Sequence, residues 1–382
     1  MNLIKIFFAA LITLSNIQFA QQKVTVTFNV YASGLNDTDI IYISGNHEQL
    51  GNWQPGKIRL TAQKNSEWSL ATEFVKGTEL EFKFTLGDWS REALNDDESV
   101  PANNKLFVLT DTVLNITISK WSSPETKKVT VQITGTVEYQ RQFNSNFVKP
   151  RDIIILLPEN YYFTDQHYPV LYMHDGQNIF DPSTSTFGYD WQVDETADSL
   201  IRAKCIESII IVGIYNTSER SSEYAPNDTG KAYMKFIVEE LKPFIDEHYR
   251  TIPDRNNTAV AGSSMGGLIS FMLLWEYPNI FSKAACLSPA FKIGRFDYVS
   301  NVVNTTNIPD DILVYIDNGG IELEALLQPG IDEMISALET NGFLREKNFY
   351  WKKFETAYHN EQAWADRFYL PLKLFFGSDK RD

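Results

Sequence analysis

The stretch TAVAGSSMGGLISFMLLWEYP (258–278) decides the fold. An apolar run, the motif GSSMG (262–266) and a helix-compatible run that stops at Pro278 follow one another in it. The pattern G-x-S-x-G between a strand and a helix is typical of a sharp turn in which glycines let neighbouring backbones approach. We therefore predict that Ser264 is an exposed nucleophile at a helix N-terminus, where peptide dipoles favour developing negative charge.

Continuous apolar runs lie on both sides of this stretch and alternate with helical patterns. Such runs are typical of parallel strands that are buried on both faces. Helical spacing recurs at 233–249 and 331–338, with Pro243 expected to kink or split the first helix. Residues 129–380 are therefore predicted to form an α/β domain with a mostly parallel sheet. The apolar runs are IIILL (153–157), PVLYM (169–173), ESIIIVG (207–213), TAVAG (258–262), KAACLS (283–288) and ILVYID (312–317).

A serine hydroxyl is a weak nucleophile unless a base takes its proton, so a histidine must serve Ser264. In the chain order that goes with such a turn the base follows the nucleophile, and of five histidines only His359 does so. His359 lies in ETAYHNEQAW (355–364), after a strand-like run and before a helix. It is the predicted base. Structural roles are expected for His47, His167, His174 and His248.

The acid that orients the imidazole is expected in the loop after the next strand. That loop, DNGGIELEA (317–325), offers three carboxylates. Glu322 is preferred, because the Gly-Gly turn before it can carry a carboxylate out towards His359. Asp317 and Glu324 remain open as alternatives.

Acyl transfer at a serine also needs two backbone donors for the tetrahedral oxyanion. The N–H of Met265, directly after the nucleophile, is predicted to be one. The N–H of Gln177 is predicted to be the other, in the turn HDGQN (174–178), with Gly176 supplying backbone freedom. The sequence thus predicts a complete machinery for acyl transfer.

The first third of the chain has a different pattern. Short alternating stretches between residues 24 and 121 are separated by Gly, Asn, Asp and Pro and show no helical period. Residues 23–121 are therefore predicted to form a small all-β sandwich. The polar, proline-containing stretch SSPETKK (122–128) is the predicted linker. The fold class is thus multidomain, with a β-sandwich before the α/β domain.

The N-terminus has the layout of a secretory signal. Lys5 precedes an apolar run (6–14), and a signal at residues 1–20 would end at Ala20. We expect export to the periplasm or out of the cell, with no stable membrane association after cleavage. Gln18 at the −3 position is not small, so an uncleaved anchor is the alternative.

The charge balance limits the partners. The 382 residues carry 34 basic and 49 acidic side chains, for a formal net charge of −15. Such a charge repels phosphate backbones and anionic headgroups, so neither nucleic acid nor a membrane surface is an expected partner. Cys205 and Cys286 lie inside apolar runs and are expected to be free thiols buried in the core.

With these residues in hand, the second domain resembles the putative-esterase family of α/β hydrolases. That family includes feruloyl and acetyl xylan esterases, siderophore esterases, S-formylglutathione hydrolase and mycolyltransferases. The resemblance implies a serine esterase that acts on carboxylic esters without a metal or other cofactor. It rests on YPVLYMHDGQNIFD (168–181), LKPFIDEHYRT (241–251), the stretch 259–291 around Ser264, and YHNEQAW (358–364).

The first domain resembles a starch-binding module of carbohydrate-binding family 20. By that likeness Trp53, Lys83 and Trp89 fall on sugar-binding positions, where indole rings stack on a pyranose. The stretch after Trp89 departs from the family's spacing to a downstream asparagine. The alternative is that these tryptophans only pack the sandwich. The likeness rests on YISGNHEQLGNW (42–53), WSLATEF (68–74), ELEFKF (79–84) and GDW (87–89).

These features predict a secreted serine esterase that removes acyl groups from carbohydrates while the first domain holds a glycan. A siderophore esterase that opens catecholate ester lactones is one alternative, although the acidic net charge argues against it. A glycan-binding protein with an inert hydrolase half is another, although an intact set of serine, histidine and carboxylate argues against it. Arg220, Glu223 and Tyr224, in NTSERSSEYAP (216–226), are candidates for lining the pocket.

Overall fold

The computed structural model describes residues 22–36, 38–63, 66–96, 101, 103–122, 133–186, 188–294, 296–305 and 311–378. The chain forms two compact units that divide between residues 127 and 128. The predicted signal (1–20) and nearly all of the predicted linker (122–128) lie outside the described residues. No described helix is both long enough and apolar enough to cross a membrane.

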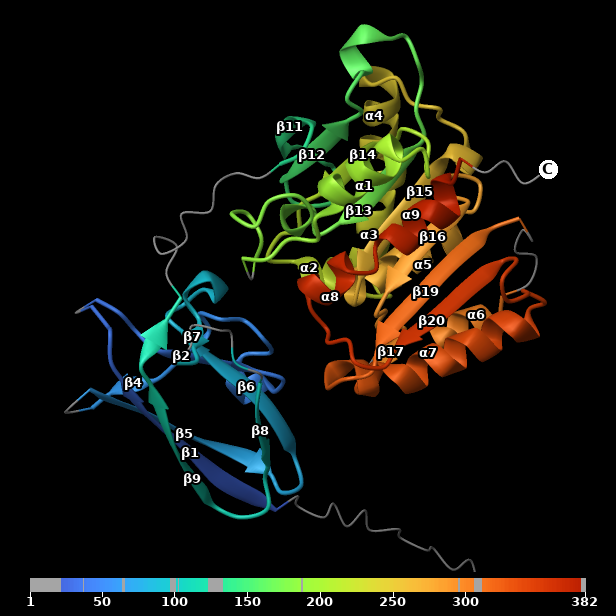
Figure 1. Cartoon of the computed structure of the whole chain (residues 1–382). Helices are drawn as coiled ribbons and strands as arrows, with labels where there is room; N and C mark the ends of the chain where they lie inside the picture. Colours follow the sequence, from blue (N-terminus) through green and yellow to red (C-terminus); the bar gives the residue numbers. More distant parts are fainter. Residues whose placement is uncertain are drawn as a thin grey trace, which may run out of the picture. The chain divides into compact units, whose positions relative to one another are not determined.

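The first unit is a sandwich of two four-stranded sheets around one apolar core (Figure 1). One sheet contains β4 (Thr61–Ala62), β5 (Glu67–Val75), β1 (Lys23–Ala32) and β9 (Thr112–Ile118), and the other β3 (Ile58–Arg59), β2 (Tyr42–Gly45), β6 (Glu79–Thr85) and β8 (Asn104–Phe107). Every second side chain of β1 is buried, as its alternating sequence requires. β1 pairs antiparallel with β5 and parallel with β9. The predicted β-sandwich is confirmed, with one mixed sheet.

An eight-stranded sheet forms the centre of the second unit (Figure 1). The first two strand pairs in the sheet, β11 with β12 and β12 with β14, are antiparallel. From β14 onwards all neighbouring strands are parallel. Every residue of β13, β14 and β15 is buried, which explains their continuous apolar sequences. In sheet order the strands are β11 (Thr136–Phe143), β12 (Arg151–Leu157), β14 (Ile210–Ile214), β13 (Val170–His174), β15 (Thr258–Ser263), β16 (Lys283–Leu287), β19 (Leu313–Gly319) and β20 (Phe349–Phe354).

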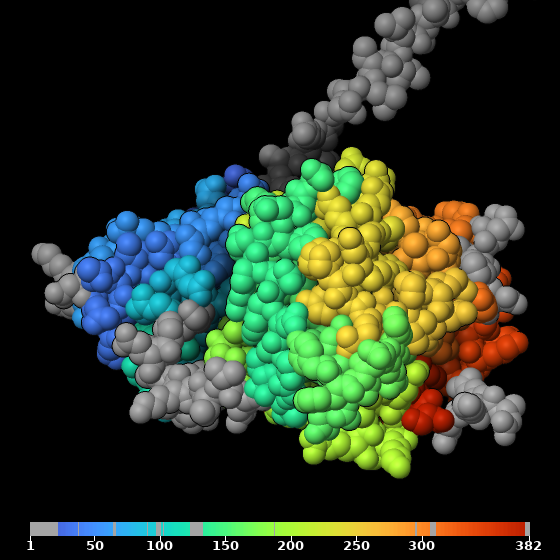
Figure 2. Space-filling view, turned by 90° about the horizontal axis from the view of Figure 1, so that it is seen from above, coloured from blue at the N-terminus to red at the C-terminus, as the bar shows by residue number. Residues whose placement is uncertain are grey.

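Helices cover both faces of this sheet, and each face has its own apolar core. Figure 2 shows residues near 140 beside residues near 245 on the surface of this unit, in agreement with the contact between Phe143 and Phe244. The three layers confirm the predicted α/β fold with a mostly parallel sheet. One face carries α3 (Asp228–Lys235), the π-helical η5 (Phe236–Leu241), α4 (Lys242–His248), α5 (Met265–Glu276), α6 (Val299–Val303) and α7 (Leu323–Thr340). The other carries α1 (Val193–Arg202), α8 (Glu361–Ala365) and α9 (Tyr369–Phe376).

Two local expectations need adjustment. The chain stays helical up to His248 over the segment predicted at 233–249, and Pro243 is the second residue of α4, so its missing N–H falls close to where the π-helical η5 ends and the hydrogen-bond register changes. Both cysteines are free, as predicted, but only Cys286 is buried, whereas Cys205 is exposed after α1.

The sheet sets the position of the predicted site residues. The carboxyl ends of neighbouring parallel strands meet at one edge, where binding sites of open α/β sheets form. The turn 174–178 follows β13, Ser264 follows β15, and the loop 320–322 follows β19. His359 follows β20, which pairs with β19. The fold thus brings these separate segments to one edge.

Candidate active site

Ser264 lies at the sharp turn that the sequence predicts. β15 ends at Ser263, α5 begins at Met265, and Ser264 between them has φ 55° and ψ −122°, a strained conformation for a residue with a side chain. A Cβ on Gly262 would lie 2.6 Å from the carbonyl carbon of Gly266, so the turn closes only with glycine there. Ser264 is partly exposed, whereas Ser263 is buried.

The turn after β16 holds the backbone of the nucleophile. The N–H of Ser264 donates to the carbonyl of Leu287 at 2.9 Å, and the N–H of Ala290 donates to the carbonyl of Ser264 at 3.0 Å. Both backbone groups of Ser264 are therefore tied to residues 287–290. The turn 287–290 therefore fixes the position of the Ser264 backbone within the candidate site.

His359 is paired with a buried carboxylate. Its Nδ1 lies 3.1 Å from Oε1 of Glu324, and only 11% of its side chain is exposed, against 0% for Glu324. Its ring also packs edge to face against Trp364, at 5.0 Å between centroids. With Nδ1 donating its proton to Glu324, Nε2 is left to accept one, as a general base requires.

The carboxylate that contacts His359 is that of Glu324 and not that of Glu322, which the sequence favoured. Glu322 is exposed and precedes the first residue of α7 with φ 56°, whereas Glu324 lies on the first helical turn with its carboxylate buried. Asp317, the other alternative, is also buried, but its described hydrogen bonds are with Arg367 and Tyr315. The turn into the helix, rather than the glycines before it, decides which carboxylate reaches His359.

The surroundings keep Glu324 charged. Burial by itself raises the pKa of a carboxyl group, but hydrogen bonds with His359 and Ser288 outweigh it and hold the pKa of Glu324 below its usual range. In contrast, burial raises the pKa of Asp317 to about 6, with Arg367 and Tyr315 acting in the opposite direction. Glu324 is therefore an anion at neutral pH, able to stabilise an imidazolium.

The predicted oxyanion donors lie on segments that contact each other. Asp175 has a left-handed backbone, and a Cβ on Gly176 would lie 2.5 Å from the backbone of Gly213, so only glycine fits. A Cβ on Gly266 would lie 3.4 Å from Oδ2 of Asp175. The loop of Gln177 thus rests on the first turn of α5, which begins with Met265. The donor roles of Gln177 and Met265 stay predictions.

An ion pair that the sequence does not reveal fixes this loop. Nε and Nη2 of Arg220 each donate to one oxygen of Asp175 at 2.7 Å, and Asn216 donates to the same carboxylate at 2.6 Å. The pairing joins residues 45 positions apart, so no local pattern signals it. Of the three pocket candidates, Arg220 keeps partial exposure, whereas Glu223 and Tyr224 are buried.

His174 is excluded as a base by its surroundings. It is 1% exposed, and burial lowers its pKa to about 3. Its Nδ1 lies 2.9 Å from the hydroxyl of Tyr233. The ring is therefore neutral at neutral pH and is held inside the fold directly before the turn 175–178, which agrees with the structural role predicted for it.

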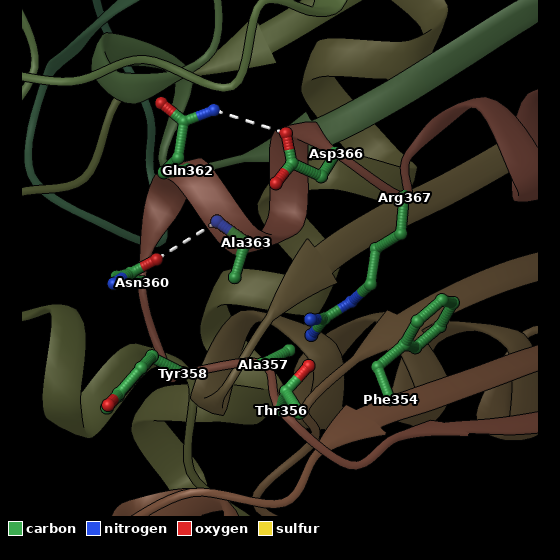
Figure 3. Close-up of a pocket in the computed structure, with 9 residues that line it drawn as sticks. All are labelled: Phe354, Thr356, Ala357, Tyr358, Asn360, Gln362, Ala363, Asp366 and Arg367. Atoms are coloured by element: carbon green, nitrogen blue, oxygen red, sulfur yellow. Dashed lines mark hydrogen bonds between the residues drawn. The ribbon is translucent and has the colours of Figure 1, made fainter.

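A cavity of about 400 Å³ lies beside the loop of His359 (Figure 3). Its volume is within the range of small-molecule pockets. Tyr358 and Asn360, the neighbours of His359 in sequence, are part of its wall. The mixed lining offers an aromatic ring, amides and a guanidinium. The lining residues are Phe354, Thr356, Ala357, Tyr358, Asn360, Gln362, Ala363, Asp366 and Arg367.

Three carboxylates gather at the start of α1, where no ligand role was predicted. Each of the three side chains places a carboxylate oxygen within 4.8 Å of carboxylate oxygens of the other two. They are Asp190, Asp194 and Glu195. Asp194 accepts a hydrogen bond from the N–H of Thr134 at 2.5 Å. Burial and the neighbouring Glu195 raise the pKa of Asp194 to about 8, so the two carboxyl groups can share a proton. The cluster lies outside the predicted catalytic set.

The predicted sugar-binding residues lie together in the first unit. The rings of Trp53 and Trp89 are 6.4 Å apart between centroids with a tilt of 38°, and both side chains are partly exposed. Lys83 is less available, because its ammonium is 3.1 Å from Glu92 and its side chain is 14% exposed. The two indoles form a tilted aromatic surface, while Lys83 is held in an ion pair.

Family models match both units. A model described as putative esterase matches residues 145–370, and one described as starch binding domain matches residues 23–138. The first match covers more than half of the chain.

Relatives with this likeness include two named esterases. An endo-1,4-beta-xylanase/feruloyl esterase from Xylanibacter ruminicola is 28% identical over 191 residues, 47% of this chain and 23% of that protein. The ferri-bacillibactin esterase BesA of Bacillus subtilis is 24% identical over 177 residues, 38% of this chain and 58% of that protein. The uncharacterized protein YjcH of Bacillus subtilis is 28% identical over 158 residues, 41% of this chain and 62% of that protein. The chain spans less than two thirds of each of these three.

Solved structures share the fold. A ferulic acid esterase matches 63% of this chain and 98% of its own, with a TM-score of 0.53 and 20% identity. The enterobactin esterase FES from Shigella flexneri matches 92% of both chains, with a TM-score of 0.53 and 13% identity. At such identities the likeness extends to the fold alone.

The first prediction concerns the nucleophile. Ser264→Ala is expected to lower the turnover of a soluble chromogenic ester by roughly 10⁶-fold, without lowering the melting temperature, because the partly exposed hydroxyl is not part of the core. Ser263→Ala, the same change at the buried neighbour, is the control and should keep turnover. Near-normal turnover in Ser264→Ala would contradict the assignment.

The second prediction separates the two glutamates. Glu324→Gln should lower kcat by roughly 10³- to 10⁴-fold, because the amide cannot stabilise the imidazolium, with little change in KM. Glu322→Gln, the same change on the exposed side of the turn, should leave both constants unchanged. Steady-state kinetics of the two variants decide the matter, and a loss confined to Glu322→Gln would restore the sequence-based choice.

Proposed function

The chain belongs to the putative esterase family and is a carboxylic ester hydrolase, and from that premise we propose that Ser264, His359 and Glu324 remove acyl groups from carbohydrates. The observation that carries the mechanism is the 3.1 Å contact between Nδ1 of His359 and the buried, ionised Glu324. An imidazole oriented in this way has its other nitrogen available for the proton of a serine.

The proposed reaction has two halves. The hydroxyl oxygen of Ser264 attacks the ester carbonyl while Nε2 of His359 takes the hydroxyl proton, and Glu324 stabilises the imidazolium. The N–H groups of Met265 and Gln177 stabilise the oxyanion until the alcohol leaves with a proton from His359. Water then attacks the acyl-enzyme, with His359 again as base, and releases the acid.

The starch-binding unit supports a carbohydrate as the alcohol part of the ester. The tilted indoles of Trp53 and Trp89 suit the apolar faces of sugar rings. A unit that holds a polymer raises the local concentration of esters carried on that polymer. Export through the predicted signal (1–20) would give the enzyme access to such polymers and is part of the proposal.

A catecholate siderophore is the second candidate substrate. Arg220 favours it, because a partly exposed guanidinium lies beside the proposed oxyanion loop. Against it, both oxygens of Asp175 already accept hydrogen bonds from that guanidinium, and the chain's net charge of −15 repels an anionic ligand. A non-catalytic glycan-binding protein is disfavoured, because such a protein has no need of a buried carboxylate that orients a histidine.

A comparison of substrates tests the proposed function. Acetylated and feruloylated oligosaccharides should be hydrolysed with a higher kcat/KM than a catecholate ester lactone, because the guanidinium of Arg220 is already paired with Asp175. Initial rates on the three classes, each corrected with Ser264→Ala, give the comparison. A kcat/KM at least tenfold higher for the lactone would contradict the carbohydrate proposal.

Glycan binding by the first unit is tested in the whole chain. Trp53→Ala should weaken binding of a soluble α-glucan by about 1 to 3 kcal/mol, the scale of an aromatic anchor. Tyr31→Ala removes another exposed aromatic ring, on β1, and is the control. Titration calorimetry measures both, and hydrolysis of a small soluble ester should not change in either. Equal affinity in Trp53→Ala and the unaltered chain would mean that Trp53 does not bind sugar.

A further inference from the structure

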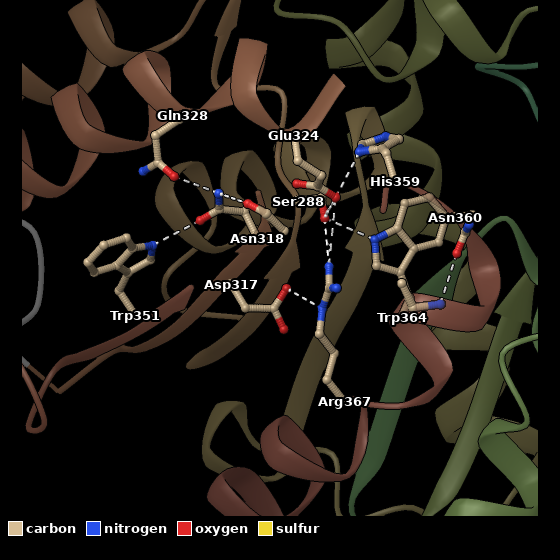
Figure 4. Close-up of polar contacts among 12 residues, drawn as sticks. Ser288, Asp317, Asn318, Glu324, Gln328, Trp351, His359, Asn360, Trp364 and Arg367 are labelled. Carbon is tan, nitrogen blue, oxygen red and sulfur yellow. Dashed lines mark hydrogen bonds and ion pairs between the residues drawn. The ribbon is translucent and has the colours of Figure 1, made fainter. Parts of the chain in front are cut away.

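A chain of buried hydrogen bonds continues from Glu324 to Ser288 and Arg367 (Figure 4). The hydroxyl of Ser288 lies 2.5 Å from Oε1 of Glu324, the same oxygen that faces the histidine. It also lies 2.7 Å from Nη2 of Arg367 and 3.0 Å from Nε1 of Trp364. Ser288 itself has no exposed surface.

The chemistry of these partners fixes the direction of every hydrogen bond. A guanidinium and an indole N–H can only donate, so Arg367 and Trp364 occupy the two lone pairs of the Ser288 oxygen. The single hydroxyl proton then has one acceptor left, which is Glu324. The serine hydroxyl is therefore a donor to the acid and cannot rotate towards another partner without losing two hydrogen bonds.

The donor behind Ser288 is itself held in place. Nε of Arg367 donates to Asp317 at 2.9 Å, and the hydroxyl of Tyr315 donates to the other oxygen of Asp317 at 2.9 Å. The side chains of Arg367 and Asp317 are 2% and 0% exposed. The pair neutralises itself, and Nη2 of Arg367 stays 3.9 Å from Glu324, beyond a hydrogen bond.

The backbone of Ser288 connects this chain to the nucleophile. Ser288 lies in the turn 287–290, whose first and last residues hold the N–H and the carbonyl of Ser264. Its own N–H donates to the carbonyl of Asp317 at 2.7 Å, and its φ is 44°, a left-handed conformation. Ser288 is therefore part of the turn that holds the backbone of Ser264, and its side chain contacts the carboxylate of Glu324.

We propose that Ser288 is a positioning residue whose side chain holds the carboxylate of Glu324 in place relative to Ser264. Arg367 and Trp364 orient the hydroxyl of Ser288 for this role. The proposal deepens the proposed function, because it rests on Glu324 acting as the acid for His359. The hydrogen bonds then run in one direction, from Arg367 through Ser288 to Glu324.

Loss of the hydroxyl has a definite consequence. Oε1 of Glu324 keeps His359 but loses its other close donor, so the carboxylate binds a proton more strongly and loses one of the two contacts that hold it. The acid is then less well aligned with the imidazolium, although no substrate-binding group has been touched.

Ser288→Ala in the full chain tests the proposal. We expect kcat to fall roughly 10- to 100-fold, as for other small losses of alignment, with KM within about twofold. The acidic limb of the kcat profile should move up by about 0.5 to 1 pH unit, because a hydrogen bond that favours the charged carboxylate is gone. Ser288→Gly, which suits the left-handed backbone, gives a second variant if alanine impairs folding.

Ser282→Ala is the matched control. Ser282 is equally buried, directly precedes β16 at the opposite end from Ser288, and donates to the carbonyl of Arg255 at 2.8 Å. The Ser282→Ala variant should at most have a less stable fold, and its pH profile should be unchanged. If both Ser288 variants keep the kcat and the profile of the unaltered chain while Ser264→Ala is inactive, the positioning role is overturned and the hydrolytic mechanism stands. If Ser264→Ala stays active, the proposed function itself is overturned.

Discussion

The anionic state of one buried carboxylate is the constraint on which the rest of the site depends. Glu324 has no exposed surface, so hydrogen bonds must replace the water that would stabilise its charge. Burial alone would raise its pKa, but His359 and Ser288, both donating to Oε1, lower it further than burial raises it. The same contacts fix the imidazole tautomer, so the stability of the anion and the orientation of the base have one cause.

The parallel sheet brings the required groups together. Its register pairs Ser263 with Leu287, the last residues of β15 and β16, so the residues that follow these strand ends leave the sheet at one level. Ser264 and Ser288 are two of these residues, and they leave from adjacent strands. Because β20 pairs next to β19, the loop that carries His359 returns to the same edge as the turn into α7. Strand order therefore brings the segments that carry the proposed nucleophile, base and acid to one edge of the sheet.

The sequence predicts what depends on local pattern or on chain order. Apolar runs predict the strands, the spacing of glycines predicts the turn at Ser264, and order in the chain selects His359. Glu322 and Glu324 could not be separated in this way, because the strained backbone at Glu322 decides which carboxylate faces inward. Arg367 and Ser288 carry no local signal, because their contact joins residues 79 positions apart. The parallel pairing of β1 with β9 also depends on contacts distant in sequence.

The charges of the buried groups near His359 explain why Arg367 is buried among them. Arg367 and Asp317 neutralise each other, which leaves Glu324 as the uncompensated anion among the described groups that contact His359. When the imidazole takes up a proton, its charge meets that anion where little water screens the attraction. Without Arg367, the charges of Asp317 and Glu324 would repel each other, and the pKa of Asp317 would rise further. A buried ion pair contributes little net stability to a fold, so this one is better explained by the single charge that it leaves on Glu324.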